Sequence, residues 1–141
     1  MEKLTFDAGV KSYRINGGAV LKFNPADPNL YQRFMEAVEK IQELEKNILP
    51  EEADPLQQLC LADKQVKETL SWVFGGGNDF DQLLGGVNLL AVAGNGERVI
   101  TNLLSALQPI MVEGAENCAK QQVDGAVAQA KQNRAQRRAQ K

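Results

Sequence analysis

Two copies of one helix start signal constrain the fold of this chain more than any other feature. Asp27-Pro28 and Asp54-Pro55 each place a good N-cap residue before a proline, which suits the first helical position because its missing N–H costs nothing there. One apolar stripe follows each signal: Leu30, Phe34, Val38, Ile41, Leu44 and Ile48, then Leu56, Leu59, Cys60, Val66, Leu70 and Val73. We predict helices over about residues 28–48 and 55–74, and the short connection between them favours an antiparallel hairpin.

The first 24 residues alternate apolar and polar side chains, which is typical of half-buried strands. The runs are residues 3–6, 11–15 and 19–23. Asp7-Ala8-Gly9 and Asn16-Gly17-Gly18 lie between these runs and favour tight turns. We therefore predict a three-stranded antiparallel β-meander over residues 2–24, with its apolar face covered by the helices.

The stretch from Gly75 to Gly96 contains seven of the twelve glycines of the chain, with apolar residues between them. No Gly-Lys-Ser/Thr sequence follows the three adjacent glycines, so a phosphate-binding loop is not expected. We predict a short helix over residues 78–84, capped by Asn78 and stopped by Gly85-Gly86. An apolar loop then leads to a last core helix over residues 96–112, which Pro109 is expected to kink or interrupt.

The remaining residues are rich in alanine and glutamine and hold little apolar material for packing against a core. They are expected to form a helix that is loosely attached or becomes ordered on meeting a partner. The predicted fold is therefore α+β and mostly α, with a short N-terminal β-meander, a helical bundle and a loosely attached C-terminal helix. A globular domain is predicted over residues 1–112, and a helical extension with a basic tail over residues 113–141.

Composition argues against an enzyme. The 141 residues include no histidine, which removes the commonest general base and a common metal ligand. Cys60 and Cys118 are too few for a zinc site, and we expect reduced thiols, with Cys60 packed in a helix face. Asp79 and Asp81 point apart on a helix and make a poor catalytic pair. We expect no enzymatic activity, metal or cofactor.

The sequence also indicates where the chain works. No apolar run approaches the roughly 18–20 residues that a membrane helix needs. The first residues, Met1-Glu2-Lys3-Leu4-Thr5, do not resemble a secretory signal peptide. We therefore expect no membrane partner and a cytoplasmic location.

Charge is distributed unevenly along the chain. The formal net charge is −2, but residues 131–141 hold five basic and no acidic residues, so the other 130 residues carry −7. A basic tail of this kind is a solvated terminus, a protein contact or an RNA-binding arm. Nucleic acid is the less favoured partner because the acidic domain would repel phosphate. A small RNA-binding regulator that uses Arg134, Arg137 and Arg138 nevertheless stays open as an alternative function.

Trp72 is the only tryptophan, and it lies near Phe74 at the end of the second predicted helix. Both side chains either close the core or anchor a partner. Burial in the core is the favoured interpretation, because tryptophan is usually well buried even in isolated domains.

The order of these features resembles the tail assembly chaperones of long-tailed bacteriophages and related prophages. The likeness lies in the β-rich start before an acidic helical body and in the aromatic–glycine segment from Trp72 to Gly86. It continues in the helix from Val99 to Val112 and in the Arg- and Ala-rich ending from Asn133 to Ala139.

The resemblance implies a non-enzymatic role in the cytoplasm of the host bacterium. Members of that family bind the long, aggregation-prone tape measure protein and deliver tail tube subunits to it. They are often made in two lengths by ribosomal frameshifting, and this chain looks like the shorter form. Many weakly binding copies along one client would act through avidity, so homo-oligomers are plausible.

A chaperone for a long helical client needs exposed apolar segments surrounded by charge. The segments Phe80–Val92 and Leu103–Met111 are candidates for that surface. The candidate partner-binding residues are Trp72, Phe74, Phe80, Leu83, Leu84, Leu103, Leu107, Met111, Arg134, Arg137 and Arg138.

Overall fold

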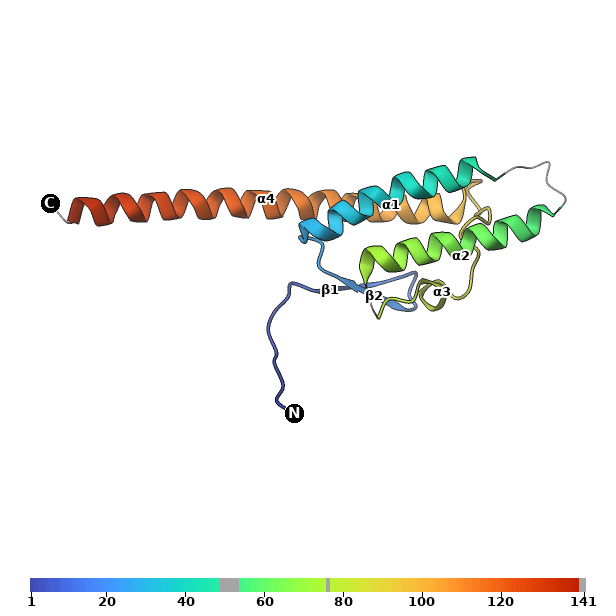
Figure 1. Cartoon of the computed structure of the whole chain (residues 1–141), viewed down its shortest axis with the longest axis horizontal. Helices are drawn as coiled ribbons and strands as arrows, with labels where there is room; N and C mark the ends of the chain where they lie inside the picture. The colour runs from blue at the N-terminus through green and yellow to red at the C-terminus, as the bar shows by residue number, and fades with distance from the viewer. Residues whose placement is uncertain (49–53, 76, 140–141) are drawn as a thin grey trace.

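The order of elements in a computed structural model agrees with the predicted fold class. The structure describes residues 1–48, 54–75 and 77–139, and of residues 123–133 and 135–139 the backbone only. The elements are β1 (Lys11–Arg14), β2 (Val20–Phe23), α1 (Pro28–Lys46), α2 (Pro55–Phe74), α3 (Phe80–Leu83) and α4 (Val99–Ala139). The α+β, mostly α class is thus confirmed, with a two-stranded antiparallel sheet before the helices (Figure 1).

Both predicted helix starts are confirmed by the cap geometry. The Asp27 carboxylate accepts a hydrogen bond from the Asn29 N–H at 3.0 Å, and the Asp54 carboxylate accepts one from the Gln57 N–H at 3.0 Å. The prolines occupy the first helical turn of α1 and α2. The two helices pack against each other and run antiparallel (Figure 1), so the predicted hairpin forms.

Of the three predicted strands, the first does not form. β1 and β2 pair antiparallel with Tyr13 opposite Leu21 and Arg14 opposite Val20, whereas residues 1–10 are extended without strand pairing. Leu4 and Phe6 remain 88% and 74% exposed. Alternation alone does not make a strand, because a strand also needs a neighbour with which to exchange hydrogen bonds.

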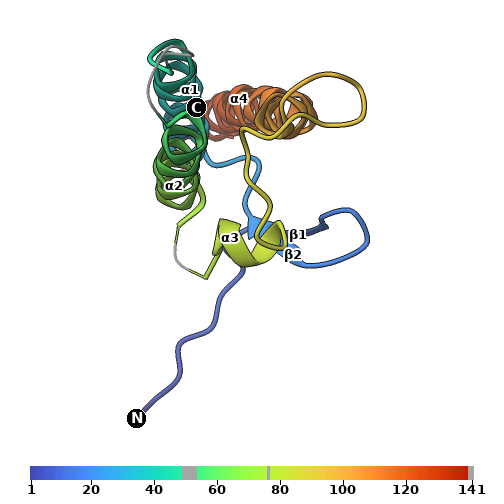
Figure 2. The ribbon, with the colours of Figure 1, turned by 90° about the vertical axis from the view of Figure 1, so that its right-hand side faces the viewer.

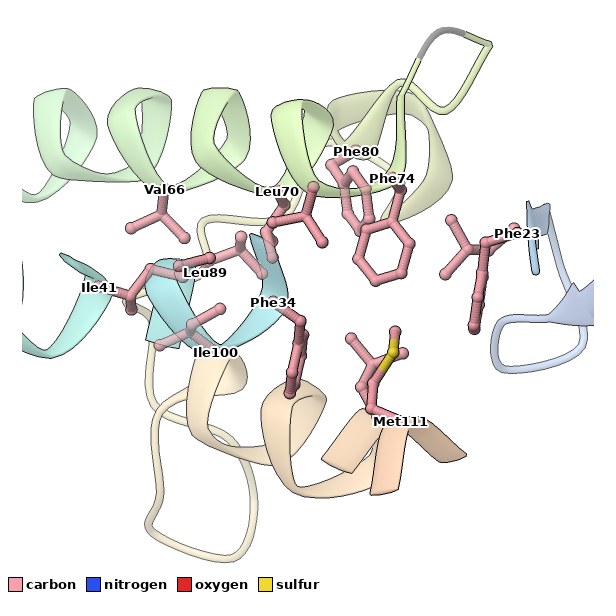
Figure 3. Close-up of a cluster of buried hydrophobic side chains, with 14 of the residues drawn as sticks. Phe23, Phe34, Ile41, Val66, Leu70, Phe74, Phe80, Leu89, Ile100 and Met111 are labelled. Atoms are coloured by element: carbon pink, nitrogen blue, oxygen red, sulfur yellow. The ribbon is translucent and has the colours of Figure 1, made fainter. Parts of the chain in front are cut away.

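One hydrophobic core joins all the elements. Buried side chains from α1 and α2 meet those of α4 and of the loop that precedes it, including Phe34, Val66, Leu89 and Ile100 (Figure 3). A run of aromatic contacts extends the core toward the β1–β2 hairpin and α3. The rings of Tyr13 and Phe23 stack with their centroids 4.7 Å apart. The ring centroids are 5.0 Å apart between Phe23 and Phe74 and 5.4 Å apart between Phe74 and Phe80.

The last helix is longer than predicted. α4 spans 41 residues with Pro109 inside it, whereas the sequence predicted a core helix over residues 96–112 that kinks or breaks at this proline. The helix continues past Pro109 without interruption (Figure 1). Leu107 and Met111 are both buried, so packing holds the helix on either side of the proline and offsets the lost hydrogen bond.

α4 lies beside α1, and the β1–β2 hairpin and α3 lie together below α1, α2 and α4 (Figure 2). The closest approach involves Gly114, where a Cβ atom would lie 2.5 Å from the carbonyl carbon of Pro25 in the connection before α1. Burial, and then the negative charge of the neighbouring Glu113 on α4, raises the pKa of Tyr13 on β1. Core packing therefore reaches beyond residue 112, and the rest of α4 projects from the body as a single helix (Figure 1).

Candidate binding surface

Trp72 lies at the surface rather than in the core. Its side chain is 51% exposed, so the favoured interpretation from the sequence is wrong and the partner-anchor interpretation stays open. The reason is helical register: Leu70 and Val73 point into the core, and a residue two positions after Leu70 falls on the opposite face of the helix. Phe74, only two residues further along α2, is buried.

Trp72 borders an open groove between α1 and α2, which we call the Trp72 groove. Its volume is about 670 Å³, and it is lined by Glu36, Ala37, Lys40, Gln65, Glu68, Thr69 and Trp72. Alanine and threonine leave room between the two helices, and the indole forms an apolar wall. Two carboxylates and one ammonium group leave the groove with a formal charge of −1. An amphipathic helix with an apolar side chain and a basic neighbour would match this surface.

A second, smaller groove of about 250 Å³ separates α1 from α4. Met35 and Leu104 contribute apolar surface to it, and Glu45 contributes a negative charge. Met35 is among the exposed large apolar side chains. Methionine adapts to irregular partners because its side chain is unbranched and polarizable, so this groove offers a partner a second apolar contact, between α1 and α4.

Most of the candidate residues predicted from the sequence lie elsewhere. Phe74, Phe80, Leu107 and Met111 are buried, and Figure 3 shows three of them inside the core. They are core residues and cannot contact a partner in this conformation. The sequence could not show this, because an apolar stripe has the same spacing whether it faces the core or a binding partner. Three others are half-buried and pack against the core: Leu83, Leu84 and Leu103.

The predicted basic surface is described only in part. Arg134 is exposed on the projecting part of α4. The side chains of Arg137 and Arg138 lie outside the described residues.

The glycine-rich segment closes the core and does not form an open docking surface. Phe80, Leu89 and Leu90 are buried, while Val87 and Val92 are exposed. The Leu89 N–H donates to the Asp63 carboxylate at 2.7 Å, and the Leu89 carbonyl accepts from the Ile100 N–H at 2.8 Å. These contacts fix the loop between α2 and the start of α4.

Asn78 was predicted to cap α3, and this prediction is wrong. Asp79 caps the helix, accepting from the Asp81 N–H at 3.0 Å. The buried Asn78 side chain instead accepts from the Lys22 N–H at 3.2 Å and donates to the carbonyls of Lys22 at 2.9 Å and Phe74 at 3.2 Å. A side-chain amide matches one donor and one acceptor of a strand, so Asn78 occupies the outer edge of β2 as a partner strand would.

A charged cluster holds α3 against α2. The buried Lys67 ammonium lies 2.9 Å from the Asp63 carboxylate and 2.6 Å from that of Asp81. Burial alone would lower the pKa of Lys67, but hydrogen bonds and negative charge from Asp81 and Asp63 outweigh it and raise the pKa. This cluster was not predicted from the sequence. Asp63 and Lys67 lie four residues apart, a spacing that could have revealed their pairing on one helix face, whereas Asp81 could be found only from the fold.

The thiols and possible metal ligands are not gathered into a site. Cys60 is exposed and Cys118 is half-buried, both as free thiols, so the prediction that Cys60 packs in a helix face is wrong. Among the described residues, no three His, Cys, Asp or Glu side chains cluster to hold a metal ion. No helix in this part of the chain has the length and apolar character needed to cross a bilayer.

The chain was also compared with known proteins at the level of sequence families, curated sequences and solved structures. None of the three comparisons gave a significant match.

Proposed function

We propose that this chain is a bacteriophage tail assembly chaperone that binds the tape measure protein and assists assembly of the tail tube. The Trp72 groove is the observation that carries the proposal. It offers a half-exposed indole between two helices, with carboxylates of Glu36 and Glu68 beside it. The likeness of the sequence to tail assembly chaperones supports the identity of the client.

The physical basis of the proposal is recognition of a helix in a groove. The client contributes an apolar side chain against Trp72 and a basic side chain near Glu36 or Glu68. The smaller groove beside Met35 and Leu104 provides a second apolar contact. Each contact is weak, so many chains bound along one long client would act together through avidity.

The proposed role requires no chemistry on a covalent bond. The charged cluster of Lys67, Asp63 and Asp81 is engaged in ion pairs within the body, and Asp79 caps α3. Binding in the host cytoplasm during tail assembly fits this surface, with the tail tube protein as a second partner.

Co-expression with the tape measure protein encoded next to this chain tests the proposal. We expect the fraction of soluble tape measure protein to rise severalfold when the chain is present and the two proteins to purify together. Trp72→Ala should abolish most of this gain. Leu61→Ala is a matched control, because Leu61 lies on the same helix, is 53% exposed and does not line the groove. No gain in soluble client, or an equal loss with both variants, would refute the proposal.

One observation favours RNA as the alternative partner. Arg134 is exposed on α4 twenty residues beyond Gly114, about 30 Å along the helix axis, where repulsion of phosphate by the acidic body is weak. This alternative predicts a gel mobility shift with RNA at low salt that disappears on raising the salt or deleting residues 131–141. The absence of any shift at low salt would rule it out.

A further inference from the structure

The first residues of the chain form an arm that packs against no other described element. Residues 1–7, which we call the N-terminal arm, are extended and leave the body at the start of the hairpin (Figures 1 and 2). Its large apolar side chains are fully or largely exposed: Met1, Leu4 and Phe6. Leu4 and Phe6 lie on one side of an extended chain and Lys3 and Thr5 on the other. The arm thus has the pattern of a half-buried strand, but no residue that the structure describes covers it.

Contacts at the base of the arm direct it away from its own sheet. The Asn24 amide donates to the Ala8 carbonyl at 3.1 Å, and the Gly9 N–H donates to the Asp7 carboxylate at 2.8 Å. Gly9 has a φ of +75°, and a Cβ at this position would lie 2.8 Å from the Asn24 amide nitrogen. The chain is therefore held beside Asn24, which follows β2, and does not turn back along the outer edge of β1.

That outer edge of β1 is open. The Ile15 N–H bonds the Ala19 carbonyl, and the register pairs Tyr13 with Leu21. Hydrogen-bonded and non-bonded pairs alternate in an antiparallel ladder, so the backbone groups of Ser12 and Arg14 point away from β2. In the described residues the sheet has only these two strands. On the opposite edge, Asn78 already bonds the outward N–H and carbonyl of Lys22, so an added strand could not pair with β2 at that position.

We propose that the N-terminal arm of one copy adds as a third strand to the β1 edge of a second copy, and that the exchange is reciprocal. Each copy has one strand-like arm that is directed away from its own edge and one open edge, so a two-fold dimer satisfies both. The interaction goes beyond the proposed client binding, because it uses the β1–β2 hairpin and leaves the Trp72 groove free.

Side-chain chemistry selects the register of the added strand. With Phe6 opposite Tyr13 and Leu4 opposite Ile15, the arm extends the apolar face on which Tyr13 stacks on Phe23. Tyr13 and Ile15 are half-buried in the single chain, so this face has apolar surface left to cover.

A shift by two residues that moves Lys3 opposite Arg14 is disfavoured. It would place Lys3 opposite Arg14 and Glu2 on the apolar face beside Ile15, which are a like-charge pair and an unpaired buried carboxylate. In the favoured register Thr5 lies opposite Arg14 instead.

The area is sufficient for a stable dimer. Phe6 alone buries about 150–250 Å² when covered, and Leu4 and Met1 add to it. Two arms and the two edges that receive them would bury roughly 1,500–2,000 Å² together, which is the size of a standard stable interface.

Disulfide trapping between two different single-cysteine chains tests the exchange. The background carries Cys60→Ser and Cys118→Ser, one chain adds Thr5→Cys and the other Arg14→Cys. These two residues face each other at about 5.5 Å between Cα atoms in the proposed register, within reach of a disulfide. We expect a mixed disulfide dimer on mild oxidation, at least tenfold more than with Glu39→Cys, an exposed site on α1, in place of Arg14→Cys.

The oligomeric state provides the second measurement. We expect the full chain to have the mass of a dimer in light scattering, and deletion of residues 2–7, or Phe6→Asp alone, to give a folded monomer. A monomeric full chain, or a dimer that survives both changes, would overturn the proposal. Cross-linking within one molecule that carries both Thr5→Cys and Arg14→Cys would do so too, since it would show that the arm folds onto its own strand.

Discussion

Replacing Gly114 by alanine tests the position of α4 against the body, because the usual effect of this substitution should change sign. In a helix interior, glycine to alanine stabilises by about 0.5–1 kcal/mol. At Gly114 the new methyl group would lie 2.5 Å from the carbonyl carbon of Pro25, whereas ordinary contacts begin near 3.4 Å. The backbone of α4 fixes the position of the methyl group, and its neighbour at Pro25 is a backbone atom. Neither can rotate away, so α4 or the connection before α1 must move.

Overpacking costs about 1–3 kcal/mol, and a clash with backbone atoms belongs in the upper half of that range, about 2–3 kcal/mol. After the gain in helix propensity a net loss of about 1–2.5 kcal/mol remains. For a domain of this size the melting temperature should fall by about 3–10 °C. Thermal denaturation followed by circular dichroism measures the change. Ala119→Gly, at an exposed position of the same helix, is the control for propensity alone, and without the clash Gly114→Ala should raise the melting temperature by about as much as this control lowers it. A Gly114→Ala protein that melts at or above the wild-type temperature would refute the packing of α4 described above.

Three further predictions concern the connections within the body. Asn78→Ala should lower the free energy of unfolding in urea by about 2–3 kcal/mol, because it leaves backbone groups of Lys22 and Phe74 unpaired. Lys67 has a raised pKa in the folded chain, so its contribution to stability should persist below pH 10.5 and disappear as the pH rises through the folded-state pKa. Urea titrations from pH 7 to 11 should therefore reveal a loss that is smaller in Lys67→Met. Cys60→Ser should change the free energy of unfolding in urea by less than about 0.5 kcal/mol, because the thiol is exposed.

Signals local in sequence predicted the helical part of the fold well. The two Asp-Pro pairs cap α1 and α2 as expected, since capping depends on residues only two or three positions apart. The alternation that predicted β1 and β2 also predicted a strand at residues 3–6, where no pairing occurs. Strand formation depends on a distant edge, and the position of that edge is not encoded in the alternating segment.

The candidate site was harder to predict because burial depends on tertiary packing. The stripe that includes Leu107 and Met111 faces the core, and a sequence pattern does not distinguish a core face from a binding face. Trp72 was expected inside and lies outside because Leu70 and Val73 take the core positions of its helix. The strand-like role of Asn78 leaves no signal in sequence, because its partners Lys22 and Phe74 come together only in the fold.

The central claim is that the Trp72 groove binds a helical client, and the fluorescence of Trp72 tests it most directly. Trp72 is the only tryptophan, so its emission reports on this groove alone. Fragments of the tape measure protein with every tryptophan replaced by phenylalanine would be titrated into the full chain, with calorimetry in parallel. We expect a saturable blue shift whose midpoint matches the calorimetric binding curve. Binding without a change in emission, or no binding by any fragment, would contradict the account.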